Sequence, residues 1–366
     1  MNLLMISGDR SIPEARRGAF WYTLEELKQY FERVDVICPK PKNSCLSGVV
    51  HAFDRVYIHH SSRGLWRQPW WILKKGRELC GERQYRVMTV HDYPPFYNGL
   101  GAWMLQRKTG IPYIEEIHHV VGYPRAADFG EWIGRRMYWL FFQTIGKRAT
   151  AVRVVNQEVE HMVQEWTGKD HVRLLSSQYL DRKSLQPDSS IKKKYDLIFC
   201  GRLVKNKGVE NVLNVLVYLH KVSLLIVGDG SLFSKLKAQS SKLGLDGRVT
   251  FTRWLPEKND VYRAIQSAKV MVVPSKSEGG PRVALEAMAL GVPLIATRVG
   301  VLKELEKGKM YLPTTGEIED LKEKIELMLF DQALYNEYAR RGRDVLTMYC
   351  GEKLIKEYAK FLKSIA

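Results

Sequence analysis

The chain has 366 residues, of which 45% are hydrophobic and 27% are charged. This length predicts two domains, and the ordinary composition excludes a chain that is disordered throughout. The five cysteines (Cys38, Cys45, Cys80, Cys200 and Cys350) are odd in number and form no C-x-x-C pair. Their spacing argues against a zinc knuckle or a disulfide framework and favours a reducing compartment.

The formal net charge is +17, and most of the excess lies in two stretches of the chain. Residues 51–150 contain 15 Lys and Arg against 8 Asp and Glu, and residues 201–300 contain 15 against 7. A positive potential concentrated in this way suits a diphosphate, an anionic lipid headgroup or nucleic acid. The alternative is a basic soluble protein without an anionic partner.

The first residues, MNLLMISGDR, are apolar for about six positions before Gly8, which predicts a strand rather than a signal peptide. No window offers the roughly 20 apolar residues of a membrane-spanning helix. We therefore expect a cytoplasmic protein, with peripheral binding to the inner face of the membrane left open.

Short apolar runs alternate with helical patterns along the first half of the chain. Stretches such as 20–31 and 97–107 have the helical period and separate these runs. Apolar strands separated by helices predict parallel βαβ units. The predicted strands are 3–7, 34–38, 56–59, 87–90, 113–117 and 151–155.

The polar segment 181–195 interrupts this alternation with Pro187 and a run of lysines, and it is the predicted linker. The strand pattern then restarts, and charged amphipathic helices follow from Glu317 to the end. We expect an α/β protein of two Rossmann-like, doubly wound parallel-sheet domains, 1–180 and 196–351, with a final helix at 352–366 that packs back on the first. The predicted strands of the second domain are 196–200, 222–227, 248–252, 270–274, 293–297 and 310–312.

Two glycine-marked turns follow strands of the second domain. In CGRLVKNKG (200–208), Gly201 permits a sharp turn, and Arg202 and Lys207 follow it before a predicted helix. Two cations at a helix N-terminus suit a diphosphate, although a solvated basic turn explains the isolated pattern as well. The second turn contains Gly228, Asp229 and Gly230, and it is a weak signal because many strand–helix junctions favour these residues.

A third turn, in VPSKSEGGPRVALEAMALGVPLIAT (273–297), is the most informative. Glu278 lies in a polar loop, and Glu286 follows eight positions later on the predicted helix. Glu278 suits sugar hydroxyls, with the amides of Gly279 and Gly280 beside it, and Glu286 suits ribose hydroxyls. The alternative is a helix-entry glutamate and a surface glutamate, but it explains neither the loop glycines nor the acidic residue within VALEAMAL.

Together, GRLVKNKG, GDG and the E-x7-E segment resemble the retaining glycosyltransferases of family 4, which have the GT-B fold of two lobes across a cleft. The resemblance implies that Arg202 and Lys207 bind the donor diphosphate, that Glu278 contacts the donor sugar and that Glu286 contacts the nucleoside. It extends the donor site to Pro281, Arg282 and Val283. Gly280, Arg282, Val301 and Lys303 depart from the usual residues, which leaves the donor's identity open.

The first half resembles the family more loosely. RRGAF (16–20), with Gly18, stands where the family has a glycine-rich loop. His118 matches a strand-end histidine that faces the donor sugar, and the adjacent His119 is the alternative. His91 and Asp92, after another predicted strand, are candidates for the acceptor side.

The implied reaction moves a hexose with retention from a UDP- or GDP-sugar to a glycan or lipid-linked acceptor, in the assembly of glycolipid, polysaccharide or glycoprotein precursors. It implies no cofactor and no divalent metal, because the two cations act on the diphosphate. One alternative is a nucleotide-sugar epimerase of the same fold. Another is a basic nucleic-acid-binding protein, but no such motif is present, and we expect no nucleic-acid partner.

Two stretches mix tryptophan with basic residues. Residues 63–77 contain three tryptophans and five Lys and Arg, and residues 131–142 read EWIGRRMYWLFF. Such mixtures are typical of surfaces that bind anionic membranes. The alternative is two helices whose tryptophans pack in the core of the first domain.

Overall fold

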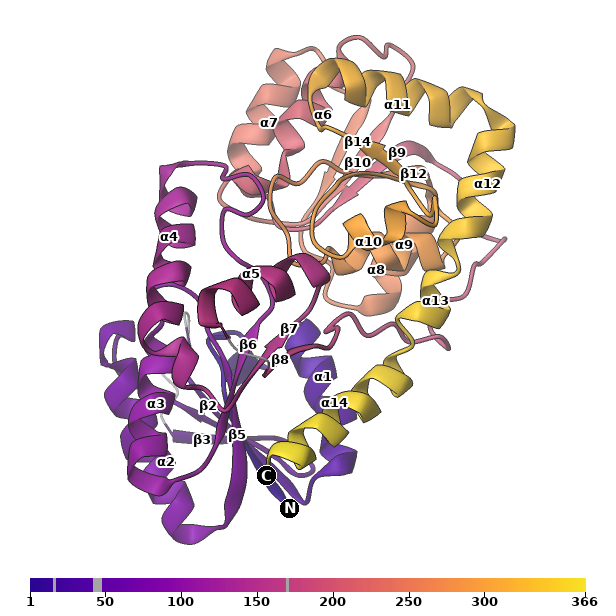
Figure 1. Cartoon of the computed structure of the whole chain (residues 1–366). Helices are drawn as coiled ribbons and strands as arrows, with labels where there is room; N and C mark the ends of the chain where they lie inside the picture. Colours follow the sequence, from indigo (N-terminus) through magenta and orange to yellow (C-terminus); the bar gives the residue numbers. More distant parts are fainter. Residues whose placement is uncertain (16–17, 42–47, 169–170) are drawn as a thin grey trace. The chain divides into compact units, whose positions relative to one another are not determined.

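The structure is a computed structural model, which describes residues 1–15, 18–41, 48–168 and 171–366. The chain divides into two compact units (Figure 1). Unit 1 consists of Met1–Val120, Ile133–Tyr179 and Glu352–Ala366, and unit 2 consists of Val121–Trp132 and Leu180–Gly351.

The sheet of unit 1 has the strand order β3-β4-β2-β1-β5-β6-β7-β8 among the described residues. Neighbouring strands are parallel except for β3, which pairs antiparallel with β4. Strands β3 and β8 were not among the predicted strands. The strands are β1 Asn2–Ile6, β2 Arg33–Cys38, β3 Gly48–Phe53, β4 Val56–His60, β5 Tyr85–His91, β6 Tyr113–Ile117, β7 Ala151–Val154 and β8 Val172–Leu174.

Helices cover both faces of this sheet. Helix α5 illustrates the local signals, because the Asn156 side chain accepts a hydrogen bond from the Val159 amide at its start and Gly168 adopts a positive φ at its end. The helices are η1 Ile12–Glu14, α1 Ala19–Leu27, η2 Lys28–Tyr30, η3 Leu65–Arg67, α2 Gln68–Glu82, α3 Tyr97–Thr109, α4 Phe129–Thr144, η4 Gly146–Arg148, α5 Gln157–Thr167 and α14 Gly351–Ile365.

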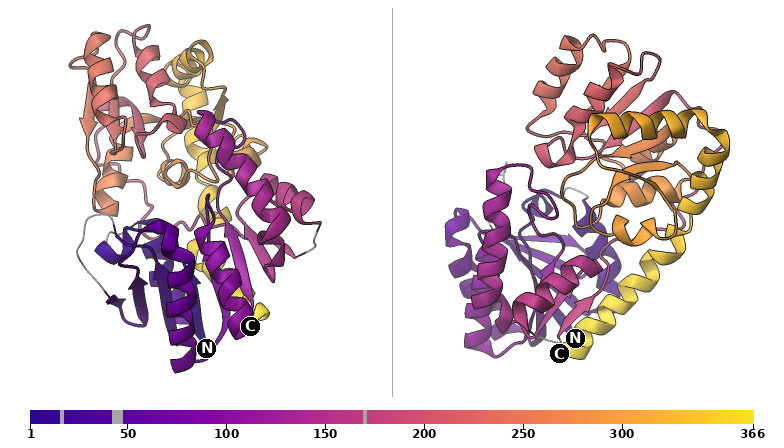
Figure 2. Two further views of the ribbon diagram at one scale, coloured as in Figure 1. Left: turned by 90° about the vertical axis from the view of Figure 1, so that its left-hand side faces the viewer. Right: turned by 45° about the horizontal axis from the view of Figure 1, so that its top comes forward.

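Alternate residues of the strands build two core layers. Leu3 and Met5 of β1 pack with α1 and α14, whereas Leu4 and Ile6 pack with α2 and α3. The last helix therefore completes the first layer, in which Tyr358 is buried. Both chain termini lie at the same end of unit 1 in all three views (Figures 1 and 2).

Unit 2 contains a parallel sheet with the order β11-β10-β9-β12-β13-β14. The chain runs outward from β9 to β11 and then resumes at β12 on the other side of β9. The strands are β9 Tyr195–Cys200, β10 Leu224–Val227, β11 Val249–Thr252, β12 Ala268–Val273, β13 Leu294–Thr297 and β14 Leu312–Thr314.

One face of this sheet packs against α6, α7 and α11, and helices α8 and α9 pack against β12. The expectation of two doubly wound α/β sheets is confirmed. The helices of unit 2 are η5 Lys205–Lys207, α6 Val209–Leu216, α7 Phe233–Lys242, α8 Lys258–Gln266, α9 Arg282–Ala289, α10 Leu302–Glu306, α11 Ile318–Phe330, α12 Gln332–Gly342 and α13 Val345–Met348.

The units differ from the predicted division of the chain in two places. Segment 121–132, expected in the first domain, belongs to unit 2. The expected linker 181–195 also belongs to unit 2. Its Leu185 is buried, and the Lys193 Nζ donates to the carbonyl of Ala268 at 2.8 Å. Polar composition suggested a free linker, but the buried Leu185 and the hydrogen bond of Lys193 attach the segment to unit 2.

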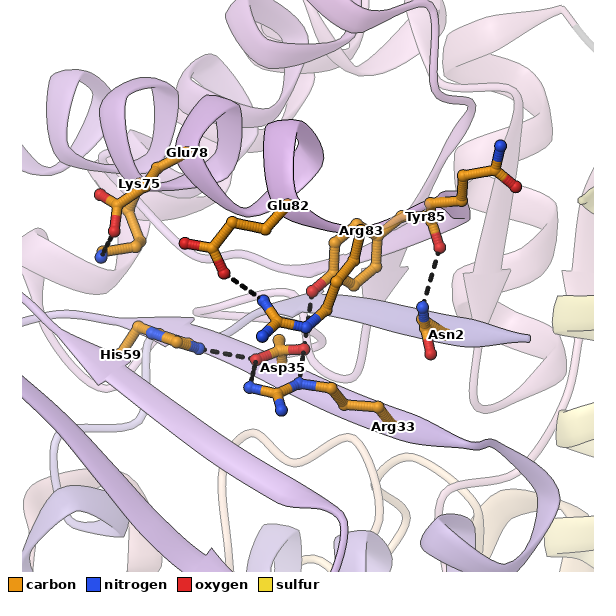
Figure 3. A network of polar contacts seen from close by, with 10 residues as sticks. Asn2, Arg33, Asp35, His59, Lys75, Glu78, Glu82, Arg83 and Tyr85 are labelled. Atoms are coloured by element: carbon orange, nitrogen blue, oxygen red, sulfur yellow. Dashed lines mark hydrogen bonds and ion pairs between the residues drawn. The ribbon is translucent and has the colours of Figure 1, made fainter.

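Asp35 is the centre of a buried polar network in unit 1 (Figure 3). Its carboxylate contacts His59 Nε2 at 2.7 Å, and it accepts hydrogen bonds from Arg33 Nε at 2.8 Å and the Tyr85 hydroxyl at 2.7 Å. Burial alone would raise the pKa of Asp35, but these hydrogen bonds lower it to about 2. The network therefore ties β2 to β4 and β5 through an ionised side chain.

Within the described ranges, no helix is both long and apolar enough to cross a membrane. The cysteines that the structure describes, Cys38, Cys80, Cys200 and Cys350, are free thiols. Cys45 lies outside the described residues.

We predict that Asp35→Asn destabilises unit 1 by about 3 kcal/mol, because it leaves buried partners without their anion. Hydrogen exchange of peptides from β2 and β4 measures the loss, with unit 2 peptides as the internal reference. The lowered pKa means that the carboxylate's contribution is complete above about pH 4 and disappears as the pH falls toward about 2, so the difference between the two proteins closes in that window.

The control is Asp54→Asn, since Asp54 is 65% exposed and pairs with Lys28 at the surface. We expect it to change stability by less than about 1 kcal/mol. Equal effects of the two substitutions on stability would contradict the stabilising role assigned to the ionised Asp35.

Candidate functional site

The candidate site of unit 2 lies where the loops after β9 and β12 leave the sheet. These two strands are neighbours, and the chain proceeds from them in opposite directions. In open parallel sheets, ligands bind at such a point, outside the carboxyl ends of the strands. The turn 201–208 follows β9, and the loop 274–281 follows β12.

The first turn approaches the second loop closely. Gly208 has a φ of +69°, and a Cβ on it would lie 2.3 Å from the carbonyl oxygen of Pro274. The backbone amide of Lys276 donates to the Asn206 carbonyl at 2.7 Å. A side chain at position 208 would separate the two loops, which explains the glycine in the motif.

This approach brings Lys207 and Glu278 together. The Lys207 ammonium contacts the Glu278 carboxylate, and Ser275 Oγ donates to the same carboxylate oxygen at 3.0 Å. Both charged side chains are only 14% exposed. Arg202 lies in the same turn and is exposed, and among the described residues its guanidinium forms no hydrogen bond or ion pair. The arrangement offers one exposed cation and one paired cation to an anion.

The rest of the E-x7-E segment begins a helix. Gly279, Gly280 and Pro281 precede α9, and Arg282 and Val283 form its first turn. Glu286 is buried on α9, where it accepts from Arg282 Nε at 3.2 Å and from the Tyr262 hydroxyl at 3.5 Å. Burial raises the pKa of Glu286, although Arg282 opposes the shift. These contacts keep the carboxylate in place beside the site.

The turn after β10 also approaches the turn after β9. A Cβ on Gly228, whose φ is +139°, would lie 1.9 Å from the carbonyl oxygen of Gly201. Asp229 pairs with Arg253 at 3.0 Å and accepts from the amide of Gly230 at 2.8 Å. The Asp229 carboxylate therefore already has hydrogen-bond partners within unit 2, namely Arg253 and the amide of Gly230.

Unit 1 brings together a second group of the predicted residues. The imidazoles of His91 and His118 stack with centroids 4.3 Å apart. His118 Nε2 lies 3.1 Å from the Glu116 carboxylate, which also accepts from Arg153 at 3.0 Å. Burial alone would raise the pKa of Glu116, but Arg153 and His118 lower it to about 2. Burial lowers the pKa of His91 to about 3, so His91 is neutral near pH 7.

The other predicted residues of unit 1 have structural contacts. Asp92 is buried and accepts backbone hydrogen bonds from Tyr93 at 3.0 Å and Gly99 at 2.6 Å. Burial nevertheless raises the pKa of Asp92 to about 7. The carbonyl of His119 accepts from the Tyr138 hydroxyl at 2.8 Å. Gly18 precedes α1, and Arg16 and Arg17 of the same motif lie outside the described residues. Roles for these residues stay predictions.

Sequence reasoning missed several contacts of the candidate site residues. It placed Lys207 with the diphosphate and Glu278 with the sugar, but it did not anticipate that they pair. It also missed Ser275, although SKSEGG places a hydroxyl three positions before Glu278. Arg153 had no motif signal, because a charged residue within a strand is revealed as buried only by the fold. In the part of the chain that the structure describes, no group of three or more His, Cys, Asp or Glu side chains forms a candidate metal site.

Both halves of the chain match models of glycosyltransferase families. Residues 181–345 match the family model described as glycosyl transferases group 1, and residues 18–176 match the model described as glycosyltransferase family 4. An uncharacterized glycosyltransferase of Haemophilus influenzae is 31% identical over 80% of this chain and 80% of its own length. One from Methanocaldococcus jannaschii is 29% identical over 76% of this chain and 75% of its own length.

Solved structures show the same fold at low sequence identity. A sucrose-phosphate synthase from Thermosynechococcus elongatus is 19% identical, with a TM-score of 0.88 over 100% of this chain and 99% of its own. Anabaena HepE, solved in complex with UDP and glucose, is 17% identical, with a TM-score of 0.79 over the whole of both chains. These similarities confirm the GT-B fold class and give no support to an epimerase or a nucleic-acid-binding protein.

We predict that Gly228→Ala disrupts the contact between the turns after β9 and β10, because its Cβ would overlap the Gly201 carbonyl. We expect Gly228→Ala to lower the free energy of unfolding by about 2 kcal/mol more than Gly244→Ala does. Gly244 is the matched control, since its φ is +68° and nothing lies within 4 Å of the place that an alanine methyl would occupy there. Thermal unfolding of both variants measures the difference, and equal melting temperatures would contradict the steric argument.

Proposed function

Because the chain belongs to family 4 of the glycosyltransferases, we propose that it transfers a hexose, with retention, from a nucleotide-diphosphate sugar to an acceptor hydroxyl. The main supporting observation is the pairing of Lys207 with Glu278 at the carboxyl ends of β9 and β12. HepE, solved with UDP-glucose, has the same fold, which favours a UDP-sugar among the donor classes.

In the proposed reaction, the bond between the anomeric carbon and the diphosphate oxygen breaks, and the electron pair leaves with the diphosphate. The acceptor oxygen bonds to the anomeric carbon on the same face, and its proton passes to an oxygen of the leaving phosphate. The transition state resembles an oxocarbenium ion, so negative charge grows on the diphosphate. Arg202 and Lys207 stabilise that charge electrostatically.

The ion pair implies an exchange of partners when the donor binds. Without a ligand, Lys207 contacts Glu278. A diphosphate offers Lys207 a stronger anionic partner, and Glu278 then becomes available to accept hydrogen bonds from sugar hydroxyls. Ser275 continues to donate to Glu278 and keeps the carboxylate in position. Glu286, held by Arg282, accepts from the ribose hydroxyls in this proposal.

We expect the thermal stability of the full chain to rise with one class of nucleotide-sugar among UDP-glucose, UDP-N-acetylglucosamine, GDP-mannose and ADP-glucose. A ligand at 100 times its dissociation constant adds about 2.7 kcal/mol. Lys207→Ala removes a cation from the diphosphate, so we expect it to abolish this stabilisation and to lower turnover on the order of 10²–10³-fold.

Lys235→Ala is the control, because Lys235 is 63% exposed and pairs with Glu210 at the surface. It should respond to the ligands as the wild type does. The proposal fails if none of the four donors stabilises the wild type, or if Lys207→Ala responds normally.

We also propose that unit 1 binds an anionic membrane through residues 63–77, and that the acceptor is lipid-linked. Trp66 and Trp70 are 59% and 58% exposed, while Trp71 packs at the edge of the core. The second stretch, on α4, exposes Trp132 and Trp139. Exposed indoles beside basic residues favour the membrane interface over a core role for these particular tryptophans.

Co-sedimentation with vesicles tests this surface. We expect the wild type to bind phosphatidylglycerol-containing vesicles at low salt, and Trp66→Ala/Trp70→Ala to bind them at least about 10-fold more weakly, because two interfacial side chains are lost. Trp254→Ala is the control, since Trp254 is 62% exposed in unit 2. Absence of wild-type binding, or equal loss in the control, would contradict the proposal.

A further inference from the structure

Segment Val121–Trp132 is a short part of unit 2 that comes from the first half of the chain. It follows β6 of unit 1 in the sequence and ends within α4, yet it packs with the loops of unit 2. We call it the clamp segment. Apart from Glu131 and Trp132, which begin the tryptophan-containing stretch 131–142, no sequence motif marks it.

The clamp segment contacts several loops at the carboxyl edge of the second sheet. Pro124 forms an antiparallel bridge with Ser277, in the loop after β12. Arg125 Nη1 donates to Glu317 at 2.8 Å, beyond β14. Additional contacts join Lys303 to the ring of Tyr123 at 5.7 Å and Lys205 to Asp128 at 3.9 Å. A segment attached at this many points is part of the edge that forms the candidate donor site.

Glu131 contacts both the clamp segment itself and the loop after β12. One of its carboxylate oxygens accepts from the amide of Ala127 at 2.8 Å and lies 3.5 Å from Ser277 Oγ. Gly122 has a φ of +74°, and a Cβ there would lie 2.5 Å from the Glu131 carbonyl oxygen. The turn thus brings the two ends of the segment together, and Glu131 is directed to the loop.

Ser277 is held from two sides. It is fully buried, and its carbonyl accepts from Asn206 Nδ2 at 3.2 Å, in the turn after β9. The clamp segment contacts it through Pro124 and Glu131. Because Glu278 is the next residue, the backbone position of Ser277 constrains the position of the Glu278 side chain.

We propose that the clamp segment orients the loop 275–278 for the donor sugar, with Glu131 as the positioning residue. This inference rests on the proposed function, in which Glu278 contacts the sugar and the turn 201–208 contacts the diphosphate. Glu131 acts on the sugar contact and leaves the diphosphate contact unchanged. Its loss therefore weakens binding of a nucleotide-sugar more than binding of the nucleotide alone.

Titration calorimetry on the full chain, with UDP and with UDP-glucose, tests the inference. If the thermal assay identifies a donor with another base, the corresponding nucleoside diphosphate and nucleotide-sugar are used in place of UDP and UDP-glucose. We expect Glu131→Gln to raise the dissociation constant of UDP-glucose about 5-fold, the scale of one modest hydrogen bond, with that of UDP unchanged. Ser277→Ala should have the same effect, and the double variant should lose no more than either single variant.

Glu337→Gln is the control, because Glu337 pairs with Arg341 on α12. It should leave both dissociation constants unchanged. Equal weakening of UDP and UDP-glucose, or no change with either, would overturn the positioning role. If Glu131→Gln fails to fold, Ser277→Ala alone decides between these results. A wild type that binds neither ligand of any base tested would instead overturn the proposed function and this inference with it.

Discussion

The pairing of Lys207 with Glu278 is the interaction around which the candidate site of the second unit is arranged. It requires the turn after β9 to touch the loop after β12, which in turn requires the absence of a side chain at Gly208. The parallel sheet supplies the common edge, since both strands end there. Because so little solvent surrounds this charged pair, its electrostatic interaction is weakly screened.

The predictable parts of the molecule are those with local or periodic signals. Alternating apolar strands and helices predicted the central strands of the first sheet and every described strand of the second, and the glycines at 201, 208 and 228 marked turns that the structure shows to need them. Strands β3 and β8, which were missed, lie at the two edges of the first sheet; β3 pairs antiparallel with its neighbour, and β8 has only 3 residues. The spacing of Glu278 and Glu286 indicated a candidate donor loop, but it did not predict that the Glu278 carboxylate contacts the Lys207 ammonium.

Long-range pairings account for most of what the sequence left open. Arg153 lies in a strand that reads as apolar, and its role appears only with Glu116 and Tyr179 around it. Likewise, residues 121–132 have no composition that distinguishes them from the rest of the first half, and their membership of unit 2 depends on contacts with residues about 150 positions later. Such contacts are set by topology, which a local pattern does not specify.

The return of α14 to unit 1 has a consequence for how the chain folds during synthesis. Tyr358, Ala359 and Leu362 complete a core layer whose other members come from the first 151 residues, and the Tyr358 hydroxyl contacts Glu116. Residues 180–351 emerge from the ribosome before that helix does, so unit 2 has all of its segments available while unit 1 still exposes apolar surface. The unit that is begun first is therefore the one finished last, and chaperones have the longest access to it.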